Sequence, residues 1–144
     1  MRQYQHLLLA VELNPEVDNL LVQKVREITI DSSAKITCLH TIEHFSSFGA
    51  AYTVSAGINV EEELVEGAKK SMQKLAQALS IPEEQQLIQI GMAKQIILEK
   101  AKKLGVDLIV IGSHGRHGVR LLLGSTASAV LHGAKCDVLA VRVV

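Results

Sequence analysis

The chain has 144 residues, and its 15 lysines and arginines balance its 15 aspartates and glutamates, so the formal net charge is zero. This length suits one domain that buries about two-thirds of the surface of its unfolded chain. The neutral charge and the aromatic content of 3% argue against a nucleic-acid-binding surface, which needs basic patches and stacking side chains. We therefore expect a single domain over residues 1–144 that binds no nucleic acid.

The apolar runs are short, and they point to a protein that does not enter the membrane. A membrane-spanning helix needs roughly 18 or more consecutive apolar residues, and no run approaches that length. The first apolar run follows the N-terminus without a signal-peptide pattern, so we expect a cytoplasmic protein. Cys38 and Cys136 lie far apart in apolar runs and outside any Cys-x-x-Cys spacing. This pattern favours two buried free thiols over a disulfide or a metal site.

Apolar runs alternate along the chain with segments of helical periodicity. Most of the runs are continuously apolar, which is typical of strands that are covered on both faces. Strands that alternate with helices predict right-handed crossovers and a doubly wound α/β domain with a parallel sheet between helical layers. We expect strands at 6–11, 35–42, 85–90, 108–111 and 137–143, and helices at 15–30, 59–80, 93–104 and 125–134.

Several local signals set the boundaries of these elements. Asn14 and Pro15 supply an N-cap and a first-turn proline, and Gly105 stands where a C-terminal glycine would end a helix. The strand at 85–90 is less continuously apolar, so we expect it at an edge of the sheet. The segment from Glu43 to Gly57 has no clean period, and we interpret it as a long loop. The apolar stripe of the first helix is expected to comprise Val17, Leu20, Leu21, Val25 and Ile28.

A glycine-rich loop follows the strand expected at 108–111. Glycine lets backbone N–H groups approach an anion without a Cβ in the way, and Gly124 directly precedes the expected helix start at Ser125. In open α/β sheets, ligands bind outside the carboxyl ends of the strands, where this loop begins. Neither a Walker motif nor a Gly-x-Gly-x-x-Gly fingerprint occurs. Two interpretations stay open: a phosphate-binding loop of another kind, or ordinary turn and cap chemistry.

Other polar residues of this region have simpler interpretations. His114 and His117 have no third ligand at zinc spacing, so we expect no metal site. Arg116 and Arg120 either neutralise phosphate charge or are merely solvated. Asp107 precedes its strand, which places it at the opposite end of the sheet from the loop, and we expect it to form a turn.

The loop resembles the nucleotide-binding motif of the universal stress protein family, with Gly112-x-x-Gly115, eight further residues and then Gly124-Ser125. The opening run from His6 to Glu12 and the closing run from Cys136 to Arg142 are also similar, so the resemblance covers the whole chain. It implies a doubly wound three-layer sandwich of the adenine nucleotide α-hydrolase-like type, with a five-stranded parallel sheet in the order 3-2-1-4-5. It also implies frequent homodimers through the last strand, here Asp137 to Val144, and in one branch binding of ATP or AMP.

The resemblance implies a nucleotide site made of the strand ends and the glycine loop. Two departures from the family pattern are visible: Glu12 replaces the usual aspartate, and the spacer before Gly124 has eight residues rather than nine. The first moves a carboxylate by about one bond length, and the second implies a tighter loop or a less complete phosphate cradle. The residues implied are Ala10, Val11, Glu12 and Thr41 around adenine, Ile111, Gly112, His114, Gly115 and Arg116 near ribose and phosphates, and Gly124, Ser125 and Thr126 at the phosphate oxygens.

The expected activity is binding rather than rapid hydrolysis. An ATPase needs a carboxylate for Mg²⁺ and a group that positions water, and beyond Glu12 the sequence presents no convincing candidate for either. We expect a stress-response regulatory protein that binds ATP or AMP, with or without Mg²⁺, without fast turnover. The alternatives are a universal stress protein of the branch that binds no nucleotide and acts through protein interactions, and a slow ATP hydrolase or phosphotransferase.

Overall fold

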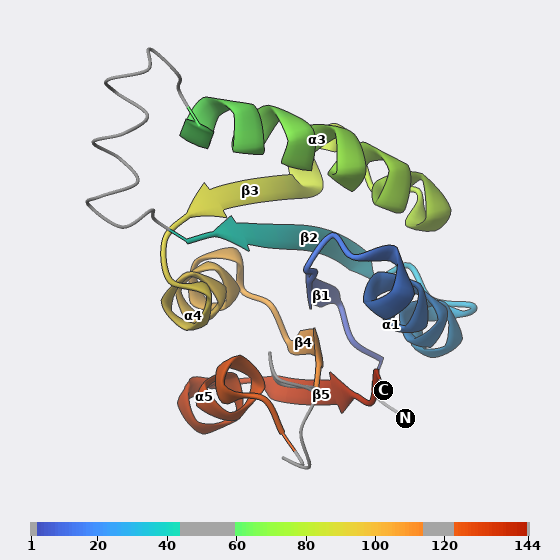
Figure 1. The fold of residues 1–144 in the computed structure, drawn as a ribbon. Coiled ribbons are helices and arrows are strands. Elements are labelled where there is room, and N and C mark those ends of the chain that lie inside the picture. The colour runs from blue at the N-terminus through green and yellow to red at the C-terminus, as the bar shows by residue number, and fades with distance from the viewer. Residues whose placement is uncertain (1–2, 44–59, 114–122, 144) are drawn as a thin grey trace.

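The computed structural model describes residues 3–43, 60–113 and 123–143. Strands and helices alternate along the described chain, as the apolar runs predict (Figure 1). In chain order the elements are β1 (His6–Ala10), α1 (Pro15–Thr29), β2 (Lys35–Ile42), α3 (Val60–Leu79), the 3-10 helix η1 (Glu83–Gln85), β3 (Gln86–Ile90), α4 (Ala93–Leu104), β4 (Leu108–Gly112), α5 (Ser125–Gly133) and β5 (Asp137–Val141).

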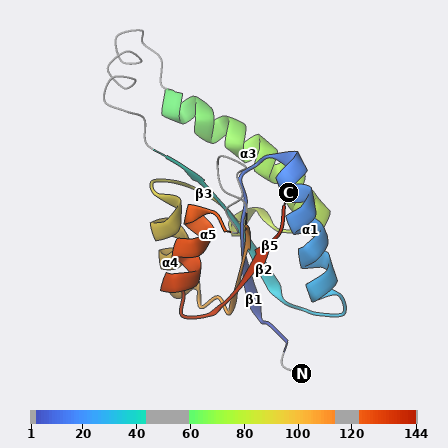
Figure 2. The same cartoon turned by 60° about the horizontal axis from the view of Figure 1, so that its bottom comes forward.

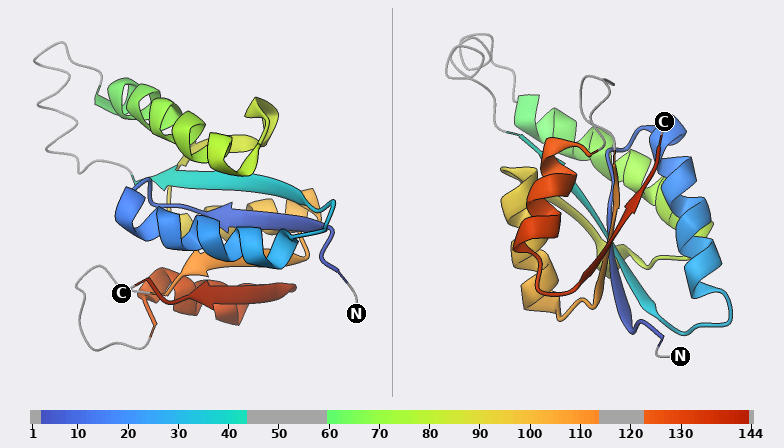
Figure 3. Two further views of the ribbon diagram at one scale, coloured as in Figure 1. Left: turned by 90° about the vertical axis from the view of Figure 1, so that its right-hand side faces the viewer. Right: turned by 90° about the horizontal axis from the view of Figure 1, so that it is seen from below.

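The five strands form one parallel sheet in the order β3-β2-β1-β4-β5, which confirms the predicted order. The central strand β1 pairs with β2 through His6 and Lys35 and with β4 through Leu7 and Leu108. All strands run in the same direction, so their carboxyl ends meet at one edge of the molecule (Figure 3). The prediction that β3 lies at a sheet edge is also confirmed.

Two helices cover each face of the sheet, with α1 and α3 on one side and α4 and α5 on the other (Figure 2). Successive side chains of a strand point to opposite faces. Leu7 and Leu9 pack in the core beneath α1 and α3, whereas Leu8 packs in the core beneath α4 and α5. All three are fully buried, which explains why the run in β1 is continuously apolar.

The predicted helix signals occur in the structure. The Asn14 side chain accepts a hydrogen bond from the Glu16 N–H at 3.1 Å, and Pro15 occupies the first turn of α1. Gly105 ends α4 in the left-handed conformation, with φ of 66°. The predicted stripe of α1 is too wide, because Leu20 and Ile28 are exposed. The buried apolar residues of α1 are Val17, Leu21, Val22 and Val25.

Smaller corrections concern strand ends and cysteines. β1 ends at Ala10 rather than residue 11, β3 begins at residue 86 after η1, and β5 ends at Val141 rather than residue 143. Both cysteines are free, and Cys38 is buried as predicted. Cys136 is only half-buried because it precedes an edge strand. The predicted loop from Glu43 to Gly57 lies, apart from Glu43, outside the described residues. No helix in the described ranges has the length and apolarity to cross a membrane.

Candidate functional site

A cavity of about 500 Å³ lies at the carboxyl end of the sheet. The ends of β1, β2 and β4 and the first turn of α5 contribute to its wall, so segments far apart in sequence meet there. Of the predicted site residues, His114, Gly115 and Arg116 lie outside the described part of the chain. The others all line the cavity: Ala10, Val11, Glu12, Thr41, Ile111, Gly112, Gly124, Ser125 and Thr126.

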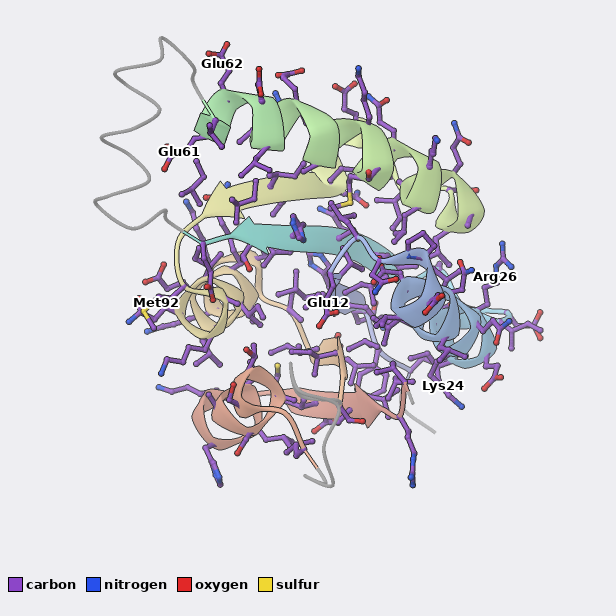
Figure 4. All side chains as sticks on the ribbon, in the orientation of Figure 1. Glu12, Lys24, Arg26, Glu61, Glu62 and Met92 are labelled. Carbon is purple, nitrogen blue, oxygen red and sulfur yellow. The ribbon has the colours of Figure 1, made fainter. Side chains whose placement is uncertain are left out.

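The strand order explains why a cavity forms at this place. From β1 the chain proceeds to β2 and β3 on one side, and β4 and β5 are added on the other side. At such a reversal the connections after β1 and β4 diverge to opposite faces and leave a crevice between them. Figure 4 shows Glu12 near the centre of the view, where β1 passes into α1.

The start of α5 presents backbone N–H groups at this cavity. Its N-cap is Gly124, which has no side chain that could accept hydrogen bonds from these N–H groups. The first intrahelical bond runs from the Ser128 N–H to the Gly124 carbonyl at 2.9 Å. The N–H groups of Ser125, Thr126 and Ala127 therefore precede the hydrogen-bonded turns of the helix. Together with the positive end of the helix dipole, these groups favour an anion.

The two ends of the predicted glycine loop are fixed side by side. The Gly124 N–H donates to the Ser113 carbonyl at 2.6 Å, and the Ser113 N–H donates to the Val141 carbonyl at 2.8 Å. A Cβ at Gly112 would have ordinary contacts, 3.5 Å from the Val143 side chain and 3.8 Å from Val17. Packing alone therefore does not require glycine at position 112.

The turn from β1 to α1 contains a buried carboxylate that sequence reasoning missed. Asp18 is only 2% exposed, and its Oδ1 accepts a hydrogen bond from the Glu12 N–H at 3.2 Å. Burial and, to a smaller extent, the charge of Glu12 raise the pKa of Asp18, whereas backbone N–H groups of the turn lower it, and the net result is a pKa of about 6. The sequence does contain a signal for this burial, because Asp18 shares the helical spacing of the buried residues Leu21, Val22 and Val25 on the inward face of α1.

Leu13 has an unusual backbone conformation within this turn. Its φ is 63°, in the left-handed region that costs a residue with a Cβ about 1–2 kcal/mol. Strained residues of this kind persist where their surroundings hold them, often beside binding sites. The hydrogen bond between Asp18 and Glu12 is one such restraint.

His40 fixes the end of β1 from the neighbouring strand. Its Nδ1 lies 2.9 Å from the Val11 carbonyl oxygen. A carbonyl oxygen only accepts hydrogen bonds, so Nδ1 carries a proton in this arrangement. The Val11 N–H donates to the Leu39 carbonyl at 2.9 Å, so Val11 is held through both of its backbone polar groups. His40 and Glu43 also line the cavity, and neither was predicted as a site residue.

The described lining has an uneven distribution of charge. Its carboxylates, Glu12 and Glu43, follow β1 and β2, whereas the N-terminus of α5 lies beyond β4. One end of the cavity can therefore accept hydrogen bonds, and the other end can donate them to an anion.

Asp107 lies at the amino end of the sheet, which confirms that it is not part of the crevice. Its two carboxylate oxygens accept hydrogen bonds from the Gln5 N–H at 2.8 Å and from the His6 N–H at 2.9 Å. Its own N–H donates to the His6 carbonyl at 3.0 Å. Asp107 therefore joins the start of β4 to the start of β1. Within the described ranges, no group of three or more His, Cys, Asp or Glu side chains is placed to hold a metal ion.

Comparison with known proteins identifies the family. The sequence pattern of the universal stress protein family matches residues 3–142. The chain belongs to the universal stress protein family. This universal stress protein is 53% identical over 143 residues to universal stress protein A homolog 2 of Coxiella burnetii, across 99% of this chain and 98% of the relative.

Solved structures of universal stress proteins share the fold. UspA from Lactobacillus plantarum superposes with a TM-score of 0.74 at 23% identity, covering 99% of this chain and 100% of that one. A universal stress protein solved in complex with cAMP has a TM-score of 0.67 at 18% identity, with the same coverage. At these identities the likeness supports the α/β architecture of this chain.

Proposed function

We propose that this universal stress protein binds an adenine nucleotide, ATP or AMP, at the carboxyl end of its sheet. It would hold the nucleotide without fast turnover and act as a cytoplasmic regulatory protein of the stress response. The observation that carries this proposal is the cavity of about 500 Å³ at the reversal of strand order, bounded by the N-terminus of α5. Its size lies within the range of small-molecule sites, roughly 300–1,000 Å³.

The charge distribution suggests how the nucleotide would lie. Phosphate groups suit the N–H groups of Ser125 and Thr126, because the N-terminus of a helix favours anions. The amino group of adenine donates hydrogen bonds and suits the other end, where the Glu12 carboxylate and the backbone of Val11 line the cavity. A bound Mg²⁺ ion would enter with the phosphates of ATP.

The related structure in complex with cAMP supports the choice of ligand class, because cAMP is itself an adenine nucleotide. An uncharged ligand would leave the anion-favouring start of α5 without a matching group. An adenine nucleotide uses both ends of the cavity.

Retained nucleotide and direct titration test the proposal. Mass spectrometry of the denatured protein should detect ATP or AMP, or calorimetry should show binding of ATP, AMP or cAMP below millimolar concentration. Neither retained nucleotide nor binding at millimolar concentration would contradict the proposal and favour the branch that acts through protein interactions. Magnesium-dependent phosphate release that survives repurification and is lost in a Ser125 variant would instead favour a slow hydrolase.

We also propose a homodimer through the last strand, from Asp137 to Val144. β5 lies at a sheet edge and pairs only with β4 among the described strands, so one side of its backbone is open to pairing. A second copy would satisfy those backbone groups by a two-fold symmetric contact. Light scattering during gel filtration should give twice the mass of one chain, and a monomer at micromolar concentration would contradict the dimer.

A further inference from the structure

The carboxylate of Asp18, a residue of α1, is buried against the turn that follows β1. Buried charged groups are normally paired with an opposite charge, because burial disfavours ionisation. The titratable groups that face Asp18 within the described residues are Glu12, from the turn after β1, and Cys38, from β2. Neither is a cation, so backbone N–H groups are what stabilise the charge.

Those N–H groups belong to three successive residues of the turn. The Glu12 N–H donates to Asp18 Oδ1 at 3.2 Å, and the N–H groups of Glu12, Leu13 and Asn14 all favour the ionised carboxylate. Leu13 is left-handed, with φ of 63°. Successive N–H groups around a left-handed residue form a concave anion site known as a nest. The anion bound in this nest is the carboxylate of Asp18 itself.

The same turn forms the part of the cavity that would receive the base. Val11 and Glu12 line the cavity, and the Val11 carbonyl is already fixed by His40 Nδ1. The backbone between Val11 and Asn14 therefore has one anchor on β2 and one on α1. Loss of the anchor on α1, which is the Asp18 carboxylate, would release the Glu12 backbone without removing any side chain that lines the cavity.

We infer that Asp18 is a positioning residue of the nucleotide site, whose ionised carboxylate holds the turn after β1 in the shape that receives the base. This inference rests on the proposed nucleotide binding. Asp18 acts through the backbone of Val11 and Glu12 and makes no contact with the ligand.

Replacing the Asp18 carboxylate by a neutral group is expected to have opposite effects on the stability of the fold and on binding of the base. Its pKa in the folded chain is about 6, above the value of roughly 3.9 for an exposed aspartate. Folding therefore disfavours the charge near neutral pH, and Asp18→Asn should increase resistance to urea there. The same substitution should weaken binding of the base. A residue that served stability alone would not move the two measurements in opposite directions.

The experiment compares Asp18→Asn with Asp31→Asn and with the unsubstituted chain. Asp31 is exposed, and its φ of 58° suits asparagine, so the control removes one charge without disturbing the backbone. The ligand is adenosine, which has no phosphate to titrate, and affinity is measured by calorimetry between pH 5 and pH 8. Urea unfolding at each pH establishes that every variant is folded.

Asp18→Asn should bind adenosine about tenfold more weakly than the unsubstituted chain at pH 7.5, because charge-assisted hydrogen bonds are lost. The affinity of the unsubstituted chain should fall as the pH falls below about 6, and Asp31→Asn should follow it. Glu12 and His40 are present in all three chains, so the difference between profiles isolates Asp18.

Two results would overturn the inference: equal affinity in Asp18→Asn, or an unsubstituted chain whose affinity rises relative to that variant on acidification. If Asp18→Asn does not fold, Asp18→Ser, which also removes the charge, takes its place in the same comparison and is judged by the same two results. If the unsubstituted chain binds neither ATP nor adenosine, the proposed function fails and this inference fails with it. If the unsubstituted chain and Asp18→Asn bind ATP with equal affinity, this inference fails while the proposed function stands.

Discussion

The two ends of β1 are each held by an aspartate that accepts backbone hydrogen bonds, yet the two aspartates differ in burial. Asp107 is half-buried and accepts N–H groups of Gln5 and His6 where the strand begins. Asp18 is 2% exposed and accepts the Glu12 N–H just after the strand ends. Desolvation is therefore a larger penalty at the carboxyl end, the end that also contains the cavity.

The polar groups around the two aspartates also differ in how they are paired. At the amino end, side chains bond to one another: the Tyr4 hydroxyl donates to Asp137 Oδ2 at 2.7 Å, and His6 Nε2 lies 2.7 Å from Thr37 Oγ1. At the carboxyl end, the first N–H groups of α5 face a cavity. The contrast indicates that side-chain hydrogen bonds stabilise the amino end, whereas a buried carboxylate and a cavity make the carboxyl end less stable.

Replacement of Asp107 by alanine should have the largest effect on stability. It removes two charge-assisted hydrogen bonds to the start of β1 and should lower the free energy of unfolding by about 3 kcal/mol. ATP affinity of the folded protein should not change, because the proposed site lies at the other end of the sheet. Urea unfolding and calorimetry would measure the two quantities. A loss of binding with unchanged stability would reverse the roles assigned to the two ends.

Asp18→Asn should increase the free energy of unfolding at pH 7.5 by up to about 3 kcal/mol. The folded pKa of about 6 exceeds the unfolded value of roughly 3.9. The contribution of Asp18 to stability is therefore greatest below about pH 4 and is lost as the pH rises through 6. The advantage of the variant should shrink as the pH is lowered from 7.5 to 4 in urea titrations. An advantage that grows on acidification would show that the folded pKa is lowered instead.

Two glycines at the carboxyl end should respond differently to alanine. Gly91 has φ of 145°, and an added Cβ would lie 2.9 Å from Ile96 Cδ1, so Gly91→Ala should lower stability by about 1–2 kcal/mol. The space around Gly112 admits a Cβ, so Gly112→Ala should change stability by less than about 0.5 kcal/mol. Thermal unfolding of both variants would test this. Equal losses of stability in the two variants would mean that packing also requires glycine at position 112.

Thiol labelling should show the smallest response to nucleotide. Burial raises the pKa of both thiols, but Cys38 is fully buried whereas Cys136 is only half-buried. A thiol reagent should therefore modify Cys136 in the folded chain and Cys38 only after denaturation. Saturating ATP should leave the rate at Cys136 unchanged, because Cys136 precedes β5 at the amino end. A strong reduction of that rate by ATP would place a nucleotide contact at the wrong end of the sheet.

Much of the fold could be predicted because its signals are local. Continuous apolar runs, the Asn14-Pro15 start and the Gly105 end each depend on a few adjacent residues, and the structure confirms them. The strand order came from the family resemblance rather than from periodicity, and it is also confirmed. The exposure of Leu20 was missed because helical spacing does not reveal how wide a stripe the neighbouring elements cover.

The candidate site was predictable only where the glycine pattern and the strand ends identify it. The roles of Asp18 and His40 depend on hydrogen bonds to the backbone of Glu12 and Val11, and such bonds leave no spacing pattern in a sequence. Glu43 reaches the cavity because β2 ends beside β1, which requires the strand order and register. Whether these residues contact a nucleotide remains a prediction.

The most direct test of nucleotide binding at the carboxyl end is an ATP titration of Ser125→Asp. Ser125 is exposed at the first position of α5, where a carboxylate suits the helix dipole and should leave stability unchanged or slightly higher. Ser33→Asp adds the same charge at an exposed residue before β2, at the amino end. We predict that Ser125→Asp weakens ATP binding at least about tenfold through repulsion of the phosphates, while Ser33→Asp does not. Equal ATP affinity in Ser125→Asp and the unsubstituted chain would contradict the proposed site.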